Sequence, residues 1–501
     1  MKRSLLKTTI PSIMMVTVFG FTLINSVHAQ ENTLGIPQNE SKEEKNKEIF
    51  KTARFDEWKK SLTPSETDAL EVFKQTYINQ FIWGVDGNMD FIKRDLYVNI
   101  GSKEEKLDAD GIRNTIRSLD KALMKSKKIE EDIHVYKYLT EKDLDFRIGN
   151  LYSSSDLNTI NKEKFKLISK NFKYGFYNSY IDPHLTKKKS VSKRWPILLD
   201  IKLPKGTHVG YLDNEGHILL QRNQGIIITN SSIIVEDGTE RIKVEAELID
   251  KKLMKNEIQA REDSFNDYFR KLIEKDTSIH RENEIPTETK LIKLVTNSLN
   301  ASFTLNRAET LLHVLTQNIP SDLLIKTLEQ MNPDKAITIT DSSWNNLENE
   351  LGEKFKDADD DTIAFFDHKT KELIVNLSLV DHHINSLQSI RDNKPALESD
   401  VQTLIHEFGH AVDDLILNDL SLTSEFNSLY EEEKGNIKIE DYMTSDQREF
   451  FASAFSYIFS PNTQYQMRIK QEAPKTVAFI QKALEERGLL KKLTKDFYKN
   501  K

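Results

Sequence analysis

The sequence predicts an α+β protein made of two domains. The chain has 501 residues, a length that suggests more than one domain, and 38% of them are hydrophobic, which is enough for packed cores. Helical periodicity dominates residues 55–136, and short β-type runs separated by Gly, Asn and Asp follow as far as residue 250. After residue 287, two strand-like runs precede a region that is helical almost throughout. Helices and strands grouped in this way are typical of the α+β class.

The first 29 residues have the three parts of a secretory signal peptide. Three basic residues form a positive start, an apolar run follows, and Ala29 closes a small-residue cleavage site. An uncleaved membrane anchor is the alternative, but the run is short for a spanning helix and Pro11 interrupts it. We therefore expect a secreted, extracellular protein without a membrane span once residues 1–29 are removed. The polar segment 30–54 reads as a disordered lead-in.

The charge and cysteine content narrow the classes of partner. The net charge is −8, and residues 1–29 carry three positive charges and no acid, so the remaining chain is near −8 − 3 = −11. An acidic surface argues against a nucleic acid partner. The chain has no cysteine, so an exported protein of this sequence relies on packing instead of disulfides.

Residues 55–250 are predicted to form the first domain. Pro64 occupies the first position of one helix, and the sequence DADGIRNTIRSLDKALMKS predicts another with four aliphatic residues on one face. The runs DIHVYKYL, PILLDIKLP, THVGYLD, HILLQR, GIIIT, SIIVED and RIKVEAELI are predicted strands. A charged helical linker is expected over residues 251–286. The second domain then covers residues 287–501, with KAITIT and ELIVNLSL as its strands.

The stretch LIHEFGHAVDD (Leu404 to Asp414) carries the pattern of a metal site. His406 and His410 are four residues apart, so both imidazoles leave one face of a helix and two neutral nitrogens reach one Zn²⁺. Glu407, beside the first histidine, is placed to hold the attacking water and take its proton. Two surface histidines beside an acid are the alternative, although a chance match is on the order of 1%.

The third ligand is expected from a later segment, since a catalytic zinc takes three protein ligands and keeps one position open. In TSDQREFFASAF, Thr444 and Gln447 suggest a capping box that begins a helix. Glu449 lies in its first turn beside an apolar face, where an unpaired acid is costly, and we predict it as the third ligand. An ordinary solvated glutamate is the alternative. Tyr442 precedes this helix and is a candidate to stabilise an oxyanion, or it serves packing alone.

Several stretches resemble a known metallopeptidase family. HEFGHAVDD, YMTSDQREFFASAF and QEAPKTVAFI resemble the catalytic domain of the anthrax toxin lethal factor family. LNDLSLTSEFNSLYEEE is closer to the secreted bacterial Pro-Pro endopeptidases of the same superfamily. The resemblance implies a mainly helical zincin-type domain with a small sheet. It also implies Zn²⁺ ligands, a general base and a transition-state tyrosine, which are His406, His410 and Glu449, then Glu407, then Tyr442.

The chain departs from this family pattern at Ser453. The resemblance covers about Thr287 to Leu490, and relatives tend to carry a second glutamate one turn after the third ligand, where this chain has Ser453. A carboxylate that would orient a ligand histidine is therefore missing or comes from elsewhere. Asp413 or Asp414 is a candidate substitute.

The first domain resembles a different enzyme family. IHVYKYL and the segment Pro196 to Ile226 resemble the bacterial binary-toxin ADP-ribosyltransferases, which implies an ADP-ribosyltransferase-like α+β fold. These enzymes need an arginine for the NAD phosphates, a Ser-Thr-Ser strand and a Glu-x-Glu turn whose second glutamate is catalytic. Here those positions hold Lys137, a single recognisable Ser179 and His217. A histidine does not replace a carboxylate that stabilises an oxocarbenium ion, so we expect an inactive binding or targeting module.

Three functions compete on this reading. The first is a secreted zinc endopeptidase, a bacterial toxin or virulence factor, that uses metal-activated water to cleave a protein or peptide substrate; a host-cell or translocation-pore protein is a further candidate partner. The second is an ADP-ribosyltransferase toxin that uses the protease-like domain for docking. The third is a surface-binding protein with a structural zinc. The protease set is complete and the transferase set lacks its glutamate, which favours the first.

Overall fold

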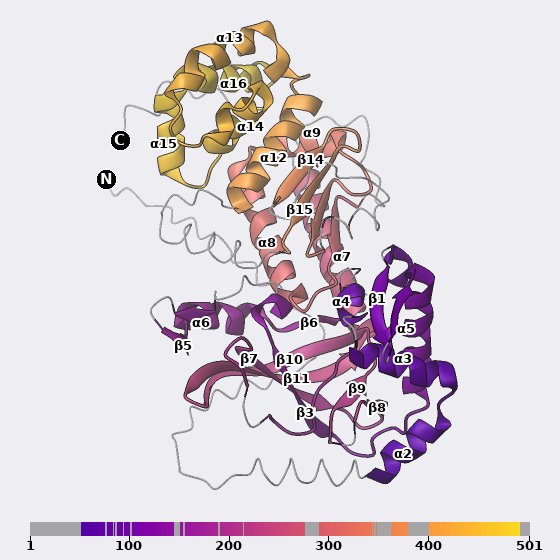
Figure 1. Ribbon diagram of the computed structural model, residues 1–501. Coiled ribbons are helices and arrows are strands. Elements are labelled where there is room, and N and C mark those ends of the chain that lie inside the picture. The colour runs from indigo at the N-terminus through magenta and orange to yellow at the C-terminus, as the bar shows by residue number, and fades with distance from the viewer. Residues whose placement is uncertain are drawn as a thin grey trace.

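The structure of the chain is a computed structural model, shown in Figure 1. It describes residues 52–490, except for residues 145–150, 276–289, 348–361 and 379–399 and the shorter breaks at 76–77, 84, 86–87, 94, 101–102, 154–155, 189–190, 214, 343 and 345–346. The predicted signal peptide and nearly all of the predicted lead-in lie outside the described residues. Among the described residues, no helix is both long and apolar enough to cross a membrane.

The N-terminal half of the described chain combines helices with most of the strands. Its helices are α2 (Thr52–Ser61), α3 (Pro64–Gln75), α4 (Ile78–Trp83), α5 (Ala109–Met124) and α6 (Lys162–Asn171), with 3₁₀ turns η1 (Met89–Phe91) and η2 (Glu141–Leu144). Its strands are β1 (Leu96–Ile100), β2 (Lys103–Leu107), β3 (Ile133–Leu139), β4 (Tyr152–Ser153), β5 (Asp156–Ile160), β6 (Tyr174–Tyr177), β7 (Ile197–Leu203), β8 (Val209–Tyr211), β9 (Ile218–Leu220), β10 (Gln224–Glu236) and β11 (Thr239–Asp250).

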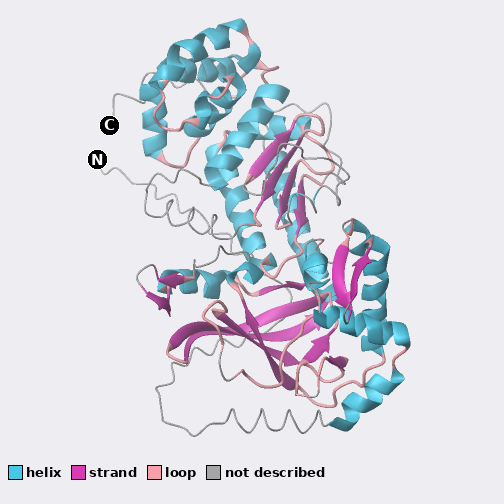
Figure 2. Cartoon of the chain, in the orientation of Figure 1, coloured by secondary structure: helices cyan, strands magenta, loops and turns pink. Residues whose placement is uncertain are grey.

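The C-terminal half is mainly helical. Its helices are α7 (Lys251–Lys275), α8 (Ala301–Asn318), α9 (Ser321–Gln330), α12 (Asp400–Leu415), α13 (Ser424–Glu433), α14 (Gln447–Ile458), α15 (Thr463–Glu472) and α16 (Pro474–Glu486). Its strands are β12 (Ile292–Val295), β13 (Ile337–Thr340), β14 (Ala364–Asp367) and β15 (Glu372–Asn376), and its 3₁₀ turns are η3 (Leu420–Leu422), η4 (Lys434–Asn436) and η5 (Tyr442–Thr444). Figure 2 shows the two groups of strands in different halves, so the predicted two-domain α+β class is confirmed.

A five-stranded sheet forms the centre of the N-terminal half, in the order β3-β7-β11-β10-β6. Strands β7 and β11 are parallel and the other neighbours are antiparallel. The runs GIIIT and SIIVED, predicted as two strands, form the single strand β10 with an irregularity between Ile228 and Asn230. The hairpin β1–β2 lies in a region predicted to be mostly helical. Its second strand, KEEKL, is nearly all charged and so lacks the alternation that identifies a strand from sequence.

In the N-terminal half, helical periodicity predicted the helices more reliably than the short β-type runs predicted the strands. The four aliphatic residues predicted to share one face of α5 are all fully buried: Ile112, Ile116, Leu119 and Leu123. Asp108 caps that helix by accepting a hydrogen bond from the backbone N–H of Gly111. Helix α3 begins at Pro64, as predicted.

The C-terminal half is built on a four-stranded sheet in the order β12-β13-β15-β14. The first three strands are parallel and β14 pairs with β15 in the antiparallel direction, which leaves β14 at one edge. Helix α12 packs against β14 and α14 in this half (Figure 1). The predicted linker begins with the long helix α7, whose buried apolar side chains belong to the same core as this sheet.

The two halves join where β6 meets the start of α8. The backbone N–H of Phe176 donates to the carbonyl oxygen of Ser298 at 2.8 Å, and the N–H of Lys173 donates to Ser302 Oγ at 2.7 Å. Gly175 lies so close that an added Cβ would be 2.1 Å from the carbonyl oxygen of Leu299. Glycine is therefore required at this contact, because the two backbones leave no room for a Cβ atom between them.

Candidate metal centre

Helix α12 is anchored at its first turn by a buried ion pair. The carboxylate of Asp400 binds the guanidinium of Arg307 on α8 in a bidentate arrangement, and both side chains are almost fully buried. The apolar face of α12 includes Leu404, Phe408 and Val412, all buried in the core of the C-terminal half. The opposite side of the helix is thereby fixed in the direction of α14.

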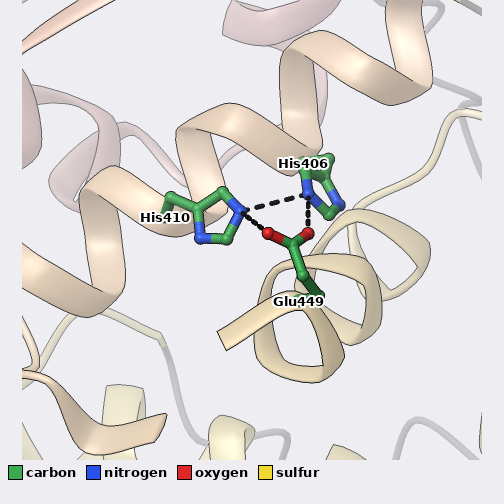
Figure 3. Close-up of side chains that lie close together, drawn as sticks. All are labelled: His406, His410 and Glu449. Carbon is green, nitrogen blue, oxygen red and sulfur yellow. Dashed lines mark hydrogen bonds and ion pairs between the residues drawn. The ribbon is translucent and has the colours of Figure 1, made fainter. Parts of the chain in front are cut away.

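The structure brings together the three residues predicted as metal ligands. His406 Nε2 lies 3.0 Å from Glu449 Oε2, and His410 Nε2 lies 3.4 Å from Glu449 Oε1. The two histidine Nε2 atoms are 3.1 Å apart. Figure 3 shows both imidazoles leaving α12 toward the carboxylate, which comes from the facing helix α14. Three potential ligand atoms from two helices therefore converge on one point.

This arrangement fits a tetrahedral zinc ion. Zinc bonds to histidine nitrogen and carboxylate oxygen are about 2.0–2.2 Å long, which places two ligand atoms of a tetrahedron about 3.3 Å apart. The two Nε2 atoms are 3.1 Å apart, and each lies 3.0 or 3.4 Å from one of the two oxygens of Glu449, distances close to that value. Two imidazoles and one carboxylate are also a donor set that catalytic zinc sites use, with one position left for water or substrate.

Helix α14 is capped differently from the prediction. Its N-cap is Asp446, whose Oδ1 accepts hydrogen bonds from the N–H groups of Arg448 and Glu449 at 2.8 and 3.0 Å. The predicted capping box of Thr444 and Gln447 is wrong: Thr444 belongs to η5 and Gln447 is the first helical residue. Asp446 directly precedes the helix, so its carboxylate binds the first backbone N–H groups that an N-cap threonine would bind, and Asp446 is therefore the cap.

Glu449 and Glu407 have opposite electrostatic environments. Burial alone would raise the pKa of Glu449, but the hydrogen bonds and charges of His406 and His410 hold it well below its ordinary value. Burial raises the pKa of Glu407 to about 7; His410 opposes the rise and Glu449 adds to it. Glu407 Oε2 also accepts a hydrogen bond of 2.9 Å from the backbone N–H of Phe366 on β14. A carboxyl group with a pKa near neutrality is well matched to proton transfer.

Tyr442 stands at the rim of the convergent side chains. It begins η5, its ring centroid lies 6.2 Å from that of His406, and it is 57% exposed. Partial burial raises the pKa of Tyr442, and the carboxylates of Glu449 and Glu407 raise it further. A phenol that stays protonated beside these groups can donate a hydrogen bond to a ligand in the site.

Ser453 itself contacts His406, a predicted ligand. Its Oγ lies 3.2 Å from His406 Nδ1, so a hydroxyl group holds the second ring nitrogen where relatives were expected to use a glutamate. Neither predicted substitute is hydrogen-bonded to a ligand histidine. Asp413 accepts hydrogen bonds from Ser421, and Asp414 pairs with His368 at 3.0 Å.

Sequence reasoning missed the contribution of the edge strand. The backbone N–H of Phe366 and the imidazole of His368 both contact α12, yet they lie about forty residues before it in the chain. No fixed spacing connects an edge strand to the helix that it packs on. Strand β14 was not among the predicted strands, so nothing in the sequence pointed to His368, which directly follows it.

Two of the residues that correspond to the transferase site, Lys137 and His217, contact the same carboxylate in the N-terminal half. Lys137 on β3 forms an ion pair with Asp182, and the Nε2 atom of His217 lies 3.7 Å from Oδ2 of the same carboxylate. His217 also stacks on His184, with ring centroids 4.3 Å apart. Ser179 is buried. The lysine at the expected arginine position and the histidine at the expected catalytic position therefore both lie next to Asp182.

Two different protein families match the two parts of the chain. Residues 47–251 match the family described as ADP-ribosyltransferase exoenzyme, and residues 278–483 match the family described as anthrax toxin lethal factor, N- and C-terminal domain. The chain is 26% identical over 387 residues to lethal factor from Bacillus anthracis, an alignment that covers 74% of this chain and 44% of the relative. It is 31% identical over 77 residues to Pro-Pro endopeptidase from Clostridioides difficile, covering 15% of this chain and 34% of the relative.

Both predicted resemblances are therefore confirmed, although the chain spans less than half the length of either relative. Among solved structures, it is similar to Plx2a, an ADP-ribosyltransferase toxin from Paenibacillus larvae, at 25% identity and a TM-score of 0.30, with 41% of this chain and 96% of that chain covered. It is also similar to the C3 exoenzyme of Clostridium limosum, at 21% identity and a TM-score of 0.33, with 44% and 98% covered.

Proposed function

We propose that this protein is a secreted zinc endopeptidase of a toxin-like class and that its C-terminal half cleaves a protein or peptide substrate. The observation that supports this most is the convergence of His406, His410 and Glu449 within hydrogen-bond distance of one another, with Glu407 and Tyr442 beside them. The similarity to lethal factor and to a Pro-Pro endopeptidase supports the same reading.

In the proposed reaction, His406, His410 and Glu449 would hold a zinc ion, which when bound would act as a Lewis acid that lowers the pKa of water and polarises a carbonyl oxygen. Glu407 takes the proton of the attacking water and passes it to the leaving amine. Tyr442, as a protonated phenol, donates a hydrogen bond to the oxyanion as it forms.

The N-terminal half is proposed to act as a binding or targeting module. Its lysine is paired with Asp182, and the residue at the expected catalytic position is His217, which stacks on His184. An oxocarbenium ion would meet an imidazole there instead of a carboxylate. The alternative, an ADP-ribosyltransferase, predicts NAD hydrolysis above background that is lost in His217→Ala, and that result would reverse our assignment.

The test of the protease proposal combines metal content with cleavage of a peptide pool. We expect about one zinc per chain, and fragments in terminal-fragment mass spectrometry that disappear with a chelator. Glu407→Gln keeps the size of the side chain and removes the base, so we expect kcat to fall about 100- to 10,000-fold with zinc retained. Glu425→Gln, an exposed glutamate on α13, is the matched control and should cleave like wild type. Fragments that are equally abundant in Glu407→Gln and wild type would refute the proposal.

A further inference from the structure

A second histidine–carboxylate pair lies beside the metal centre. His368 directly follows β14, and its Nδ1 atom lies 3.0 Å from Oδ2 of Asp414 on α12. A carboxylate oxygen accepts hydrogen bonds, so Nδ1 carries the proton in this pair. In the neutral imidazole that tautomer makes Nε2 a hydrogen-bond acceptor. The direction of the ring and the chemistry of its second nitrogen are thus set by Asp414.

His368 lies close to the proposed zinc ligands and to the segment that binds the proposed general base. His406, His410 and Asp414 follow one another at intervals of four residues on α12, so they lie along one side of the helix. The ring centroid of His368 is 6.3 Å from that of His410 and 5.1 Å from that of Phe366. Phe366 is the residue whose N–H binds Glu407. The end of the edge strand therefore reaches both the proposed base and the row of ligands.

The His368–Asp414 pair is poorly placed to serve stability alone. The His368 side chain is 41% exposed, and ion pairs this open to solvent contribute about 0–1 kcal/mol. Strand β14 is already attached to α12 by the buried side chains of Ala364 and Phe366 and by the hydrogen bond to Glu407. The fold does not need a further exposed contact at this point, whereas an oriented, accessible acceptor next to a metal centre suits a ligand.

We propose that His368 is a substrate-binding residue that accepts a hydrogen bond at Nε2 from a backbone N–H of the bound peptide, and that Asp414 is the positioning residue that holds it. This inference rests on the proposed peptidase function. Residues of an extended peptide are about 3.3 Å apart. The 6.3 Å between the ring centroids of His368 and His410 therefore equals about two residue lengths of an extended peptide, so one peptide can reach both.

The experiment uses two kinds of probe on the zinc-loaded full chain. Tri-alanine hydroxamates, with the peptide either before or after the hydroxamate group, bind the metal and also offer backbone N–H groups. Acetohydroxamic acid binds the metal alone. Calorimetry should show that His368→Ala weakens one of the two tri-alanine hydroxamates about 3- to 10-fold, the effect of one hydrogen bond. The affinity for acetohydroxamic acid should not change.

Matched variants separate substrate binding from structure. His313→Ala, an exposed histidine on α8, should leave both affinities as in wild type. His368→Gln retains an acceptor oxygen and should restore part of the lost affinity. Asp414→Ala should raise KM for a cleaved peptide while kcat stays within about 2-fold.

Equal affinity of His368→Ala and His313→Ala for both tri-alanine probes would overturn the inference, and so would a loss shared with acetohydroxamic acid. A chain that binds zinc and these probes but cleaves nothing would instead refute the proposed function. The two failures are therefore distinguishable.

Discussion

Each half of the molecule places a carboxylate beside histidines, but the partners differ. In the C-terminal half, Glu449 lies 3.0 and 3.4 Å from the Nε2 atoms of His406 and His410. In the N-terminal half, Asp182 is paired with Lys137 and is 3.7 Å from His217. The pKa of both carboxyl groups is lowered, against the effect of burial.

A lowered pKa of a carboxyl group therefore does not by itself identify a functional site. Lys137 is a permanent cation, so it neutralises Asp182 within the protein and leaves no charge for a ligand to balance. Unlike a lysine, His406 and His410 can give up a proton to bind a metal through neutral nitrogens, and the charge of Glu449 is then available to a cation. The chemical type of the partner decides between an internal ion pair and a metal centre.

The largest effect on zinc binding should come from neutralising Glu449, and the same change at Asp182 serves as the comparison. Glu449→Gln replaces the proposed anionic ligand with a neutral amide, and we expect zinc affinity to fall on the order of 100- to 1,000-fold. Asp182→Asn makes the same chemical change in the other half and should keep the full zinc content. Metal analysis after gel filtration, with competition against a chelator dye, measures both. Retention of zinc by Glu449→Gln, or its loss from Asp182→Asn, would contradict the claim that Glu449 binds a metal and Asp182 does not.

Site residues that lie at fixed spacings within one helix could be predicted from the sequence, whereas contacts made by tertiary packing could not. His406 and His410 lie on one helix at a fixed spacing, and Glu449 lies in the first turn of another, so periodicity and burial sufficed to nominate them. The cap Asp446 was missed because Thr444, two residues earlier, presents an equally good signal. The contacts of Phe366 and His368 depend on how β14 packs on α12, and that packing is a tertiary choice without a sequence period.

The stacked histidines of the N-terminal half should make its stability depend on pH. Burial is the main cause that lowers the pKa of His184 from 6.5 to about 4; His217 and Lys188 lower it further, against Asp213 and Asp182. The unfolded chain then binds more protons than the folded one between pH 6.5 and 4, so the free energy of unfolding falls as the pH falls through that window. Because the ring is partly exposed, we expect a loss of about 2 kcal/mol.

Urea unfolding followed by tryptophan fluorescence can measure this loss, since Trp58, Trp83 and Trp195 all lie in that half. His184→Gln should flatten the dependence on pH between 6.5 and 4 relative to wild type. His208→Gln is a control within the same half, because His208 binds the carbonyl oxygen of Ser126 and does not stack on His217. An equally steep dependence in His184→Gln would assign the acid sensitivity to other groups.

The smallest effect is expected at Ser453, and it tests how complete the metal centre is. The Oγ atom of Ser453 is 3.2 Å from His406 Nδ1, a contact at the long end of the hydrogen-bond range, and the residue is 1% exposed. Removing a partner of a ligand histidine commonly costs 10- to 100-fold in metal affinity. A long contact with a neutral hydroxyl should contribute less, so Ser453→Ala is expected to weaken zinc binding about 3- to 10-fold. Ser456→Ala removes a neighbouring buried hydroxyl that bonds Gln402 and the backbone carbonyl of Ser453 but neither proposed histidine ligand, and it should leave the affinity unchanged. Equal zinc affinity in Ser453→Ala and wild type would mean that the hydroxyl does not orient His406, and that the two helices alone set the direction of the ring.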